Sequence, residues 1–289
     1  MDIVAAHRWV AGVRTESPWL HEEVASRMAQ RLPWFREKPA SWLHWEPVNG
    51  GLEGHRKVRE WLPQARCHVS ARHLSQALEA TRNPAKAFWN PAQWARSRQV
   101  VAAAPDAVVG MLWANMALHF EPLPQTLLRR WFDHIATDGF LMFSCLGPDS
   151  LRELRQVYHQ AGWPDPAHAF TDMHDWGDML VHSGFAEPVM DMERITLSYS
   201  GAAPLLADLR GLGRNLQSAR FRGLRGRGWH DQLKAAIEAG LPRDQDGRLL
   251  LTFEIIYGHA FKPLPKPAAK PSQTVSVDEM RAMLRSARR

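Results

Sequence analysis

Two consecutive apolar stretches, each followed by a loop and a helix-like segment, constrain the fold of this chain most strongly. They span residues 112–120 and 139–155, and an amphipathic helical segment, 122–136, lies between them. Two strand–loop–helix units in succession predict an α/β protein with a parallel sheet, and such sheets bind ligands at the carboxyl ends of their strands. Asn115 and Ser144 stand at the ends of the two expected strands. We therefore expect both side chains at the ligand-binding edge.

Further strand and helix patterns extend this pair in both directions. Apolar or alternating runs predict strands at 41–45, 65–71, 99–103, 108–113, 140–146, 188–193, 195–199 and 248–258. Helical periodicity and capping residues predict helices at 18–32, 53–61, 73–81, 123–136, 149–161, 205–212 and 229–239, with another inside 170–184. We also expect a chain-reversing turn at 137–139 and an irregular, aromatic-rich segment at 83–98.

The order of these segments predicts one main domain, 1–262. Residues 1–36 are expected to form a helical lid, and 200–240 a helical, basic insertion. After residue 263 the composition shifts to Pro, Ala and Lys, which is typical of a linker. We expect 263–289 to be a tail with a short helix within 277–288.

Net charge and cysteine content indicate which classes of partner and which cellular compartment to expect. The net charge of +6 and the pI near 9.7 favour a polyanionic partner, which leaves nucleic acid, an anionic membrane surface and an acidic protein open. Cys67 and Cys145 lie far apart without metal-like spacing, so we expect no disulfide framework and a reducing cytoplasm. Residues 1–13 lack a long apolar stretch, and no apolar run is long enough to span a bilayer, so we expect neither a signal peptide nor a membrane helix.

A glycine-containing loop, 46–54, follows the first expected strand. Strand, glycine loop, helix and strand in this order are typical of the start of a nucleotide-binding α/β domain. Gly50-Gly51 is equally compatible with a plain turn. The loop alone therefore does not decide between these two interpretations.

Five blocks in the second half resemble one family. They are 114–120, 143–155, 172–180, 184–194 and 252–260, which run in the order that this family shows. The resemblance is to class I S-adenosylmethionine-dependent methyltransferases, and within them to the malonyl-[acyl-carrier protein] O-methyltransferases of biotin synthesis. It implies a Rossmann-like, mostly parallel seven-stranded sheet with an antiparallel last strand, and an enzyme that uses S-adenosylmethionine.

The first loop departs from that family's pattern. The family has Gly-x-Gly-x-Gly here, and its glycine positions fall at Glu46, Val48 and Gly50. The family also ends its second strand with an acid that accepts the ribose hydroxyls, and this position is Ala71 or Arg72 here. Two interpretations stay open: Glu46 or Glu53 replaces the lost contacts, or the chain binds the cofactor weakly or not at all and serves as an inactive binding or regulatory protein.

The resemblance also implies site residues. The cofactor is expected at Glu46, Asn49, Gly50, Gly51, Ala71, Ala114 and Asn115, and the acyl substrate at His119, Ser144 and His174. A malonyl carboxylate is already ionised at neutral pH, so no catalytic base is expected. Nor is a metal expected, because the resemblance accounts for the Asp/His block at 168–175 without one. Asn115 and Ser144 are also compatible with purely structural roles.

An arginine-rich stretch, 210–227, offers a surface for an acidic partner. Arg220, Arg222, Arg225 and Arg227 are expected to contact acyl carrier protein, because guanidinium groups suit carboxylates and phosphates. A solvated charged loop explains the same pattern. RNA binding or modification is a further alternative, since Phe221 and Trp229 alternate with the arginines, although no nucleic-acid module surrounds them.

Overall fold

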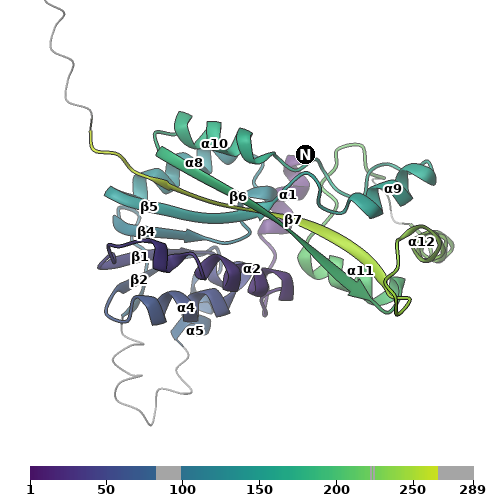
Figure 1. Cartoon of the computed structure of the whole chain (residues 1–289), viewed down its shortest axis with the longest axis horizontal. Coiled ribbons are helices and arrows are strands. Elements are labelled where there is room, and N and C mark those ends of the chain that lie inside the picture. The colour runs from purple at the N-terminus through teal and green to yellow at the C-terminus, as the bar shows by residue number, and fades with distance from the viewer. Residues whose placement is uncertain (83–98, 222, 224, 266–289) are drawn as a thin grey trace, which may run out of the picture.

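A single seven-stranded sheet organises the molecule (Figure 1). The structure is a computed structural model that describes residues 1–82, 99–221, 223 and 225–265. The strand order is β3-β2-β1-β4-β5-β7-β6, and β7 is the antiparallel member between two parallel neighbours. The predicted α/β fold, with a mostly parallel sheet and an antiparallel last strand, is confirmed.

The strands lie close to the predicted ranges. They are β1 (Ser41–Trp45), β2 (Arg66–Ser70), β3 (Val100–Ala102), β4 (Val109–Ala114), β5 (Ile135–Leu146), β6 (Ala186–Tyr199) and β7 (Leu249–Phe261). β1 and β4 consist almost entirely of buried residues. Continuous apolar runs of this kind are typical of strands covered on both faces.

Helices cover both faces of the sheet and give three layers (Figure 1). One face carries α2 (Trp19–Ala29), α4 (Leu52–Trp61) and α5 (Leu74–Arg82), and the other carries α8 (Pro124–His134) and α10 (Met173–His182). Side chains of successive strand residues point to opposite faces. Met111 and Trp113 accordingly belong to the core cluster that contains α2, whereas Leu112 packs in the cluster that contains α8 and α10.

The β6–β7 pair extends beyond the other strands and carries a helical end of the molecule (Figure 1). The helices there are α9 (Arg152–Gln160), α11 (Ala202–Leu212) and α12 (Arg227–Gly240). The N-terminal helix α1 (Ile3–Val10) joins this end through Ala6, which packs with Phe120 and Leu216. Its N-cap, Asp2, accepts a hydrogen bond from the Ala5 amide.

Three local predictions differ from the structure. The expected turn at 137–139 lies inside β5, because the strand absorbs it as an irregularity: Asp138 has φ 63° and its amide donates to the Lys262 carbonyl. The 46–54 loop is not open coil, since it contains the helical turn α3 (Pro47–Gly50). The segments 188–193 and 195–199 form one strand, β6. The expectations for 83–98 and 277–288 lie outside the described residues, and the proposed domain boundaries stay predictions.

Candidate functional site

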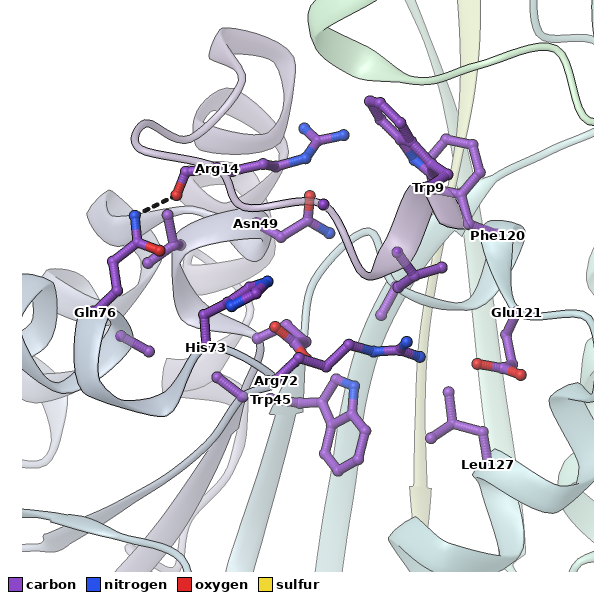
Figure 2. Close-up of a pocket in the computed structure, with 17 residues that line it drawn as sticks. Trp9, Arg14, Trp45, Asn49, Arg72, His73, Gln76, Phe120, Glu121 and Leu127 are labelled. Atoms are coloured by element: carbon purple, nitrogen blue, oxygen red, sulfur yellow. Dashed lines mark hydrogen bonds between the residues drawn. The ribbon is translucent and has the colours of Figure 1, made fainter. Parts of the chain in front are cut away.

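A pocket opens at the carboxyl ends of β1 and β2, where this class of sheet binds ligands (Figure 2). It encloses about 790 Å³ of space between atoms, its open mouth included. α1 and the loop after it cover the pocket on one side. The lining residues are Trp9, Val10, Gly12, Arg14, Trp45, Glu46, Val48, Asn49, Ala71, Arg72, His73, Gln76, Ala77, Ala117, Phe120, Glu121 and Leu127.

Glu46 brings a carboxylate to the end of β2. It follows β1 directly and has a left-handed backbone, φ 49° and ψ 58°, which is uncommon for a residue with a side chain. Its Oε1 accepts a 2.9 Å hydrogen bond from the amide of Arg72, just past β2. Its other carboxylate oxygen has no hydrogen-bond partner within the described part of the chain. A carboxylate from the end of β1 therefore lies at the end of β2, where the resemblance implies an acid.

Burial shifts the pKa of this carboxylate. Desolvation raises the pKa of Glu46, and the Arg72 amide together with the nearby positive charges of Arg72, His73 and Arg130 opposes the rise. Ala71 also lines the pocket but carries no acceptor. The carboxylate of Glu53, the other acid considered for this role, pairs with Arg56 instead, and Glu53 is not in the pocket lining.

Gly50 and Gly51 of this loop face protein rather than the pocket. A Cβ at Gly50 would lie 3.1 Å from the Asn115 carbonyl oxygen. Gly51 has φ 107°, and a Cβ there would lie 3.0 Å from the Ala25 Cβ on α2. These glycines allow α2 and the loop after β4 to approach the 46–54 segment closely.

Glu22 on α2 occupies the amides that begin α4. Its carboxylate accepts hydrogen bonds from the amide of Leu52, at 2.9 Å, and from the amide of Glu53, at 2.7 Å. A helix N-terminus attracts anions because its first amides lack partners within the helix. Here a side chain of the protein already satisfies those two amides, so neither is free for a ligand.

Asn115 and Ser144 meet at the ends of β4 and β5 but are not part of the pocket lining. Both are buried, and the Ser144 hydroxyl donates to Asn115 Oδ1 while accepting from the Met116 amide. The Asn115 side-chain amide donates to the carbonyls of His21 and Gly50. This network joins α2, the 46–54 segment and the ends of two strands. Ala114 lies in the core beside it.

The other expected substrate residues lie elsewhere. His119 is buried with its ring against Phe120, and burial keeps its pKa well below the usual value. The exposed His174 contacts Asp172 at the start of α10, where Asp172 caps the helix through the His174 amide. Asn49 does line the pocket, and its carbonyl accepts from His21 Nδ1 at 2.6 Å. The contacts of these residues with any ligand stay predictions.

The expected carrier-protein arginines differ in their surroundings. Arg220 pairs with Asp2 at 2.8 Å, which ties the start of α1 to the insertion. The guanidinium of Arg225 lies over the rings of Phe221 and Trp229, at 4.8 and 4.0 Å. Arg227 is exposed at the first position of α12, and Arg222 lies outside the described residues.

The sequence did not point to the pocket residues of the N-terminal segment. Trp9 and Arg14 come from α1 and the loop after it, far from the strand ends in sequence. Backbone contacts hold this loop: His73 Nε2 donates to the Ala11 carbonyl at 3.0 Å, and Gln76 donates to the Arg14 carbonyl (Figure 2). α1 was not among the predicted helices, and the expected lid at 1–36 gave no register against the sheet.

Two classes of feature were not found in the described residues. They contain no group of three or more His, Cys, Asp or Glu side chains placed to hold a metal ion. Within the same residues, no helix is both long and apolar enough to cross a membrane.

Curated proteins that are similar to this chain in sequence are named as methyltransferases. It is 37% identical over 267 residues to the malonyl-[acyl-carrier protein] O-methyltransferase of Laribacter hongkongensis, covering 87% of this chain and 85% of that protein. It is 35% identical over 255 residues to the protein of the same name in Gallionella capsiferriformans, covering 86% and 85%. No family model matches the chain.

Solved structures support the fold at low sequence identity. A Bacillus halodurans protein assigned as a methyltransferase superposes with a TM-score of 0.52 at 15% identity, covering 83% of this chain and 100% of that chain. The YcgJ protein of Bacillus subtilis superposes with a TM-score of 0.53 at 12% identity over the same shares. Both share the α/β architecture described above.

Proposed function

This chain belongs to the malonyl-[acyl-carrier protein] O-methyltransferase family, and on that premise we propose that it methylates the free carboxylate of a malonyl group on acyl carrier protein, with S-adenosylmethionine as methyl donor, in biotin synthesis. The observation that carries the proposal is a relation of 37% identity over 87% of the chain. The seven-stranded fold, with a pocket at the carboxyl ends of β1 and β2, supports it.

The pocket residues fit the cofactor with a changed set of contacts. S-adenosylmethionine contains an adenosine, and the pocket presents the rings of Trp9, Trp45 and Phe120 beside the Glu46 carboxylate. We propose that the free oxygen of Glu46 accepts the ribose hydroxyls, the role that the family gives to an acid at the position of Ala71 or Arg72 here. Asn49 and Ala71 border the same space. We propose that the residues just beneath the pocket hold its lining in place, namely Gly50, Gly51, Ala114 and Asn115.

Methyl transfer to a carboxylate requires little from the protein beyond the correct positioning of the two reactants. When bound, S-adenosylmethionine supplies a methyl group activated by a sulfonium. The malonyl carboxylate is ionised at neutral pH, so no residue has to remove a proton from it. The chain has to align carboxylate and methyl and exclude water. α1 and the loop after it, which cover the pocket, are suited to that exclusion. His119, Ser144 and His174 are the proposed substrate residues. Ser144 would contribute indirectly, through its hydrogen bond to Asn115.

The remaining alternatives have less support. An inactive binding protein fits the departures at Glu46, Val48 and Ala71, and the occupation of the α4 amides by Glu22. The position of the Glu46 carboxylate weakens that reading, because it restores an acceptor at the end of β2. RNA binding rests on charge and the arginine stretch alone.

Partner and compartment follow from the same proposal. Acyl carrier protein is the proposed macromolecular substrate. We propose that it binds the face of this chain that carries the exposed Arg227. Cys67 and Cys145 are free, buried thiols, which suits the reducing cytoplasm where we propose the protein works.

A transfer assay tests the function. The protein is incubated with S-adenosylmethionine and malonyl-acyl carrier protein, and the carrier is analysed by intact mass spectrometry. We expect a gain of one methyl group on the malonyl carrier and no gain on an acetyl carrier, which lacks the free carboxylate. An unmodified malonyl carrier at saturating cofactor, with the enzyme shown to be folded by circular dichroism, would contradict the proposal.

A further inference from the structure

A second cleft lies beside the pocket and shares Trp9, Gly12 and Arg14 with it. It is open to solvent and encloses about 870 Å³ of space between atoms. Its walls are the loop after α1 and the carboxyl end of α11, where Arg210 and Arg214 lie. Arg14, Arg210 and Arg214 thus face one space, and we call them the arginine cluster.

Trp9 holds two members of the arginine cluster in place. The guanidinium carbons of Arg14 and Arg214 lie over its indole ring, at 4.4 and 4.6 Å from the centroid. Figure 2 shows the Arg14 side chain extending toward Trp9 at the top of the pocket. Stacking on an aromatic ring fixes a guanidinium plane before any ligand arrives. The cluster is therefore partly preorganised.

Most donors of the cluster are unused. Arg14 Nη1 donates to the Gly211 carbonyl at 2.8 Å, and Arg214 Nη1 donates to the carbonyls of Arg210 and Gly213. The other guanidinium nitrogens of these two residues, and all those of Arg210, have no hydrogen-bond partner in the part of the chain that the structure describes. A guanidinium carries five N–H donors, so the cluster has ample capacity for an anion.

No carboxylate neutralises the cluster among the described residues. Arg14, Arg210 and Arg214 form no ion pair there, although the exposed Glu16 also lines the cleft. Arg220 on the same insertion differs, because it pairs with Asp2. Burial and the charge of Arg214 lower the pKa of Arg14 to about 10. Positive charges held close together without a counter-ion repel one another, and a bound anion reduces this repulsion.

The position of the cluster limits the kind of anion. Arg14 borders the pocket, whereas Arg210 and Arg214 also border a third, largely apolar cavity between α9, α11 and α12. Phe120 lines both that cavity and the pocket. A ligand held at the cluster can therefore extend along apolar walls toward the reaction site. This geometry suits a long, thin substituent with its negative charge at one end.

We propose that Arg14, Arg210 and Arg214 bind the phosphate of the phosphopantetheine arm through which acyl carrier protein presents its acyl group. The inference rests on the proposed function and adds the place where the arm is anchored. Guanidinium forks match phosphate oxygens and form charge-assisted hydrogen bonds with them. The arm beyond the phosphate then lies against Phe120 and the apolar cavity.

Direct binding tests this site without any turnover. Isothermal titration of the full chain compares 4′-phosphopantetheine with pantetheine, which lacks the phosphate. We expect the phosphate to strengthen binding about tenfold or more, and Arg210→Gln or Arg214→Gln each to remove most of that gain. Arg66→Gln is the matched control, because Arg66 is exposed at the start of β2, at the opposite edge of the sheet.

The outcomes separate this inference from the proposed function. Equal binding of the two compounds to the wild-type chain would overturn the phosphate site even if methyl transfer is observed. An equal loss of affinity for malonyl-pantetheine and its phosphorylated form in Arg214→Gln would also overturn it, because the cluster would then bind the carboxylate. Loss confined to the phosphorylated compounds supports the site, whether or not the transfer assay succeeds.

Discussion

The Ser144 hydroxyl donates a 2.5 Å hydrogen bond to the side-chain oxygen of Asn115, joining the ends of β5 and β4. Both residues are buried. The same hydroxyl accepts from the Met116 amide, and the Asn115 amide donates to the carbonyls of His21 and Gly50. Each of these donors and acceptors therefore has a hydrogen-bond partner within the network. Through these bonds Asn115 holds α2, the 46–54 segment and the end of β5 together beneath the pocket.

Replacing Asn115 should destabilise the protein strongly. Asn115→Ala removes the side-chain donor from the carbonyls of His21 and Gly50 and leaves the Ser144 hydroxyl proton without its buried acceptor. Because unsatisfied buried groups cost roughly 1–3 kcal/mol each, we expect the free energy of unfolding to fall by about 3 kcal/mol. Urea denaturation measures this, and Ser218→Ala on the exposed surface is a control that should leave stability unchanged. A stable Asn115→Ala protein that has lost cofactor binding would instead indicate direct ligand contact.

Glu22 should contribute to stability as a helix cap supplied by another helix. Glu22→Ala removes the acceptor for the amides of Leu52 and Glu53, and loss of a capping side chain typically costs about 1 kcal/mol. Thermal or urea denaturation should show that decrease. Glu23→Ala is the matched control, since Glu23 makes a half-exposed pair with Arg27. Equal effects of the two substitutions would argue against the cap.

Acidification should destabilise the fold through buried neutral histidines. Burial lowers the pKa of His21 to about 4 and that of His55 to about 3, and it keeps the pKa values of His44 and His119 well below the usual range. A depressed pKa in the folded state means that the unfolded state binds more protons below about pH 6.5. Stability is therefore fully present above that pH and is lost as the pH falls toward 4.

The size of this effect can be measured by urea denaturation at pH 7.5 and pH 5.5. Each such histidine contributes a loss of about 1.4 kcal/mol for each pH unit below its unfolded pKa. His55 stacks on His44, with ring centroids 5.3 Å apart, and His55→Leu removes one of these groups. The variant should have a shallower pH dependence than the wild type. Identical stability of the wild type at both pH values would refute this account.

Asp2 should control the order of α1. It caps the helix through the Ala5 amide and pairs with Arg220. In Asp2→Ala both contacts are lost, so the amides of residues 3–10 should exchange with deuterium faster than in the wild type. Asp2→Asn keeps a capping oxygen and loses only the charge pair, so its exchange should stay close to that of the wild type. Unchanged exchange in Asp2→Ala would show that neither the cap nor the ion pair with Arg220 controls the order of the helix.

Much of the fold could be predicted from local pattern. The apolar run at 108–113 and the amphipathic segment at 123–136 gave β4 and α8 within a few residues, because burial on both faces or on one face leaves a clear period. The turn predicted at 137–139 failed for a tertiary reason. Pairing of β5 with β4 and with Lys262, just after β7, carries the strand through Asp138 and Gly139.

The site was less accessible to sequence reasoning. The sequence left Glu46 and Glu53 as alternative replacement acids, and only the fold shows the Glu46 carboxylate at the amide of Arg72. The loop glycines suggested a ligand, yet Gly51 faces Ala25 because α2 crosses there. The arginine cluster joins residues about 200 positions apart, as the Arg14–Gly211 contact illustrates. Such long-range proximity leaves no local pattern.

In the proposed function, Glu46 restores the cofactor contact that the sequence of β2 lacks. Calorimetric titration with S-adenosylhomocysteine should show binding to the wild type and to Glu53→Gln, whose substituted side chain lies outside the pocket lining. Glu46→Gln can still accept from the Arg72 amide but has lost the charge that strengthens bonds to the ribose hydroxyls. We expect it to bind at least about tenfold more weakly. Equal affinity of Glu46→Gln and the wild type, or no binding to the wild type at millimolar ligand, would contradict the claim.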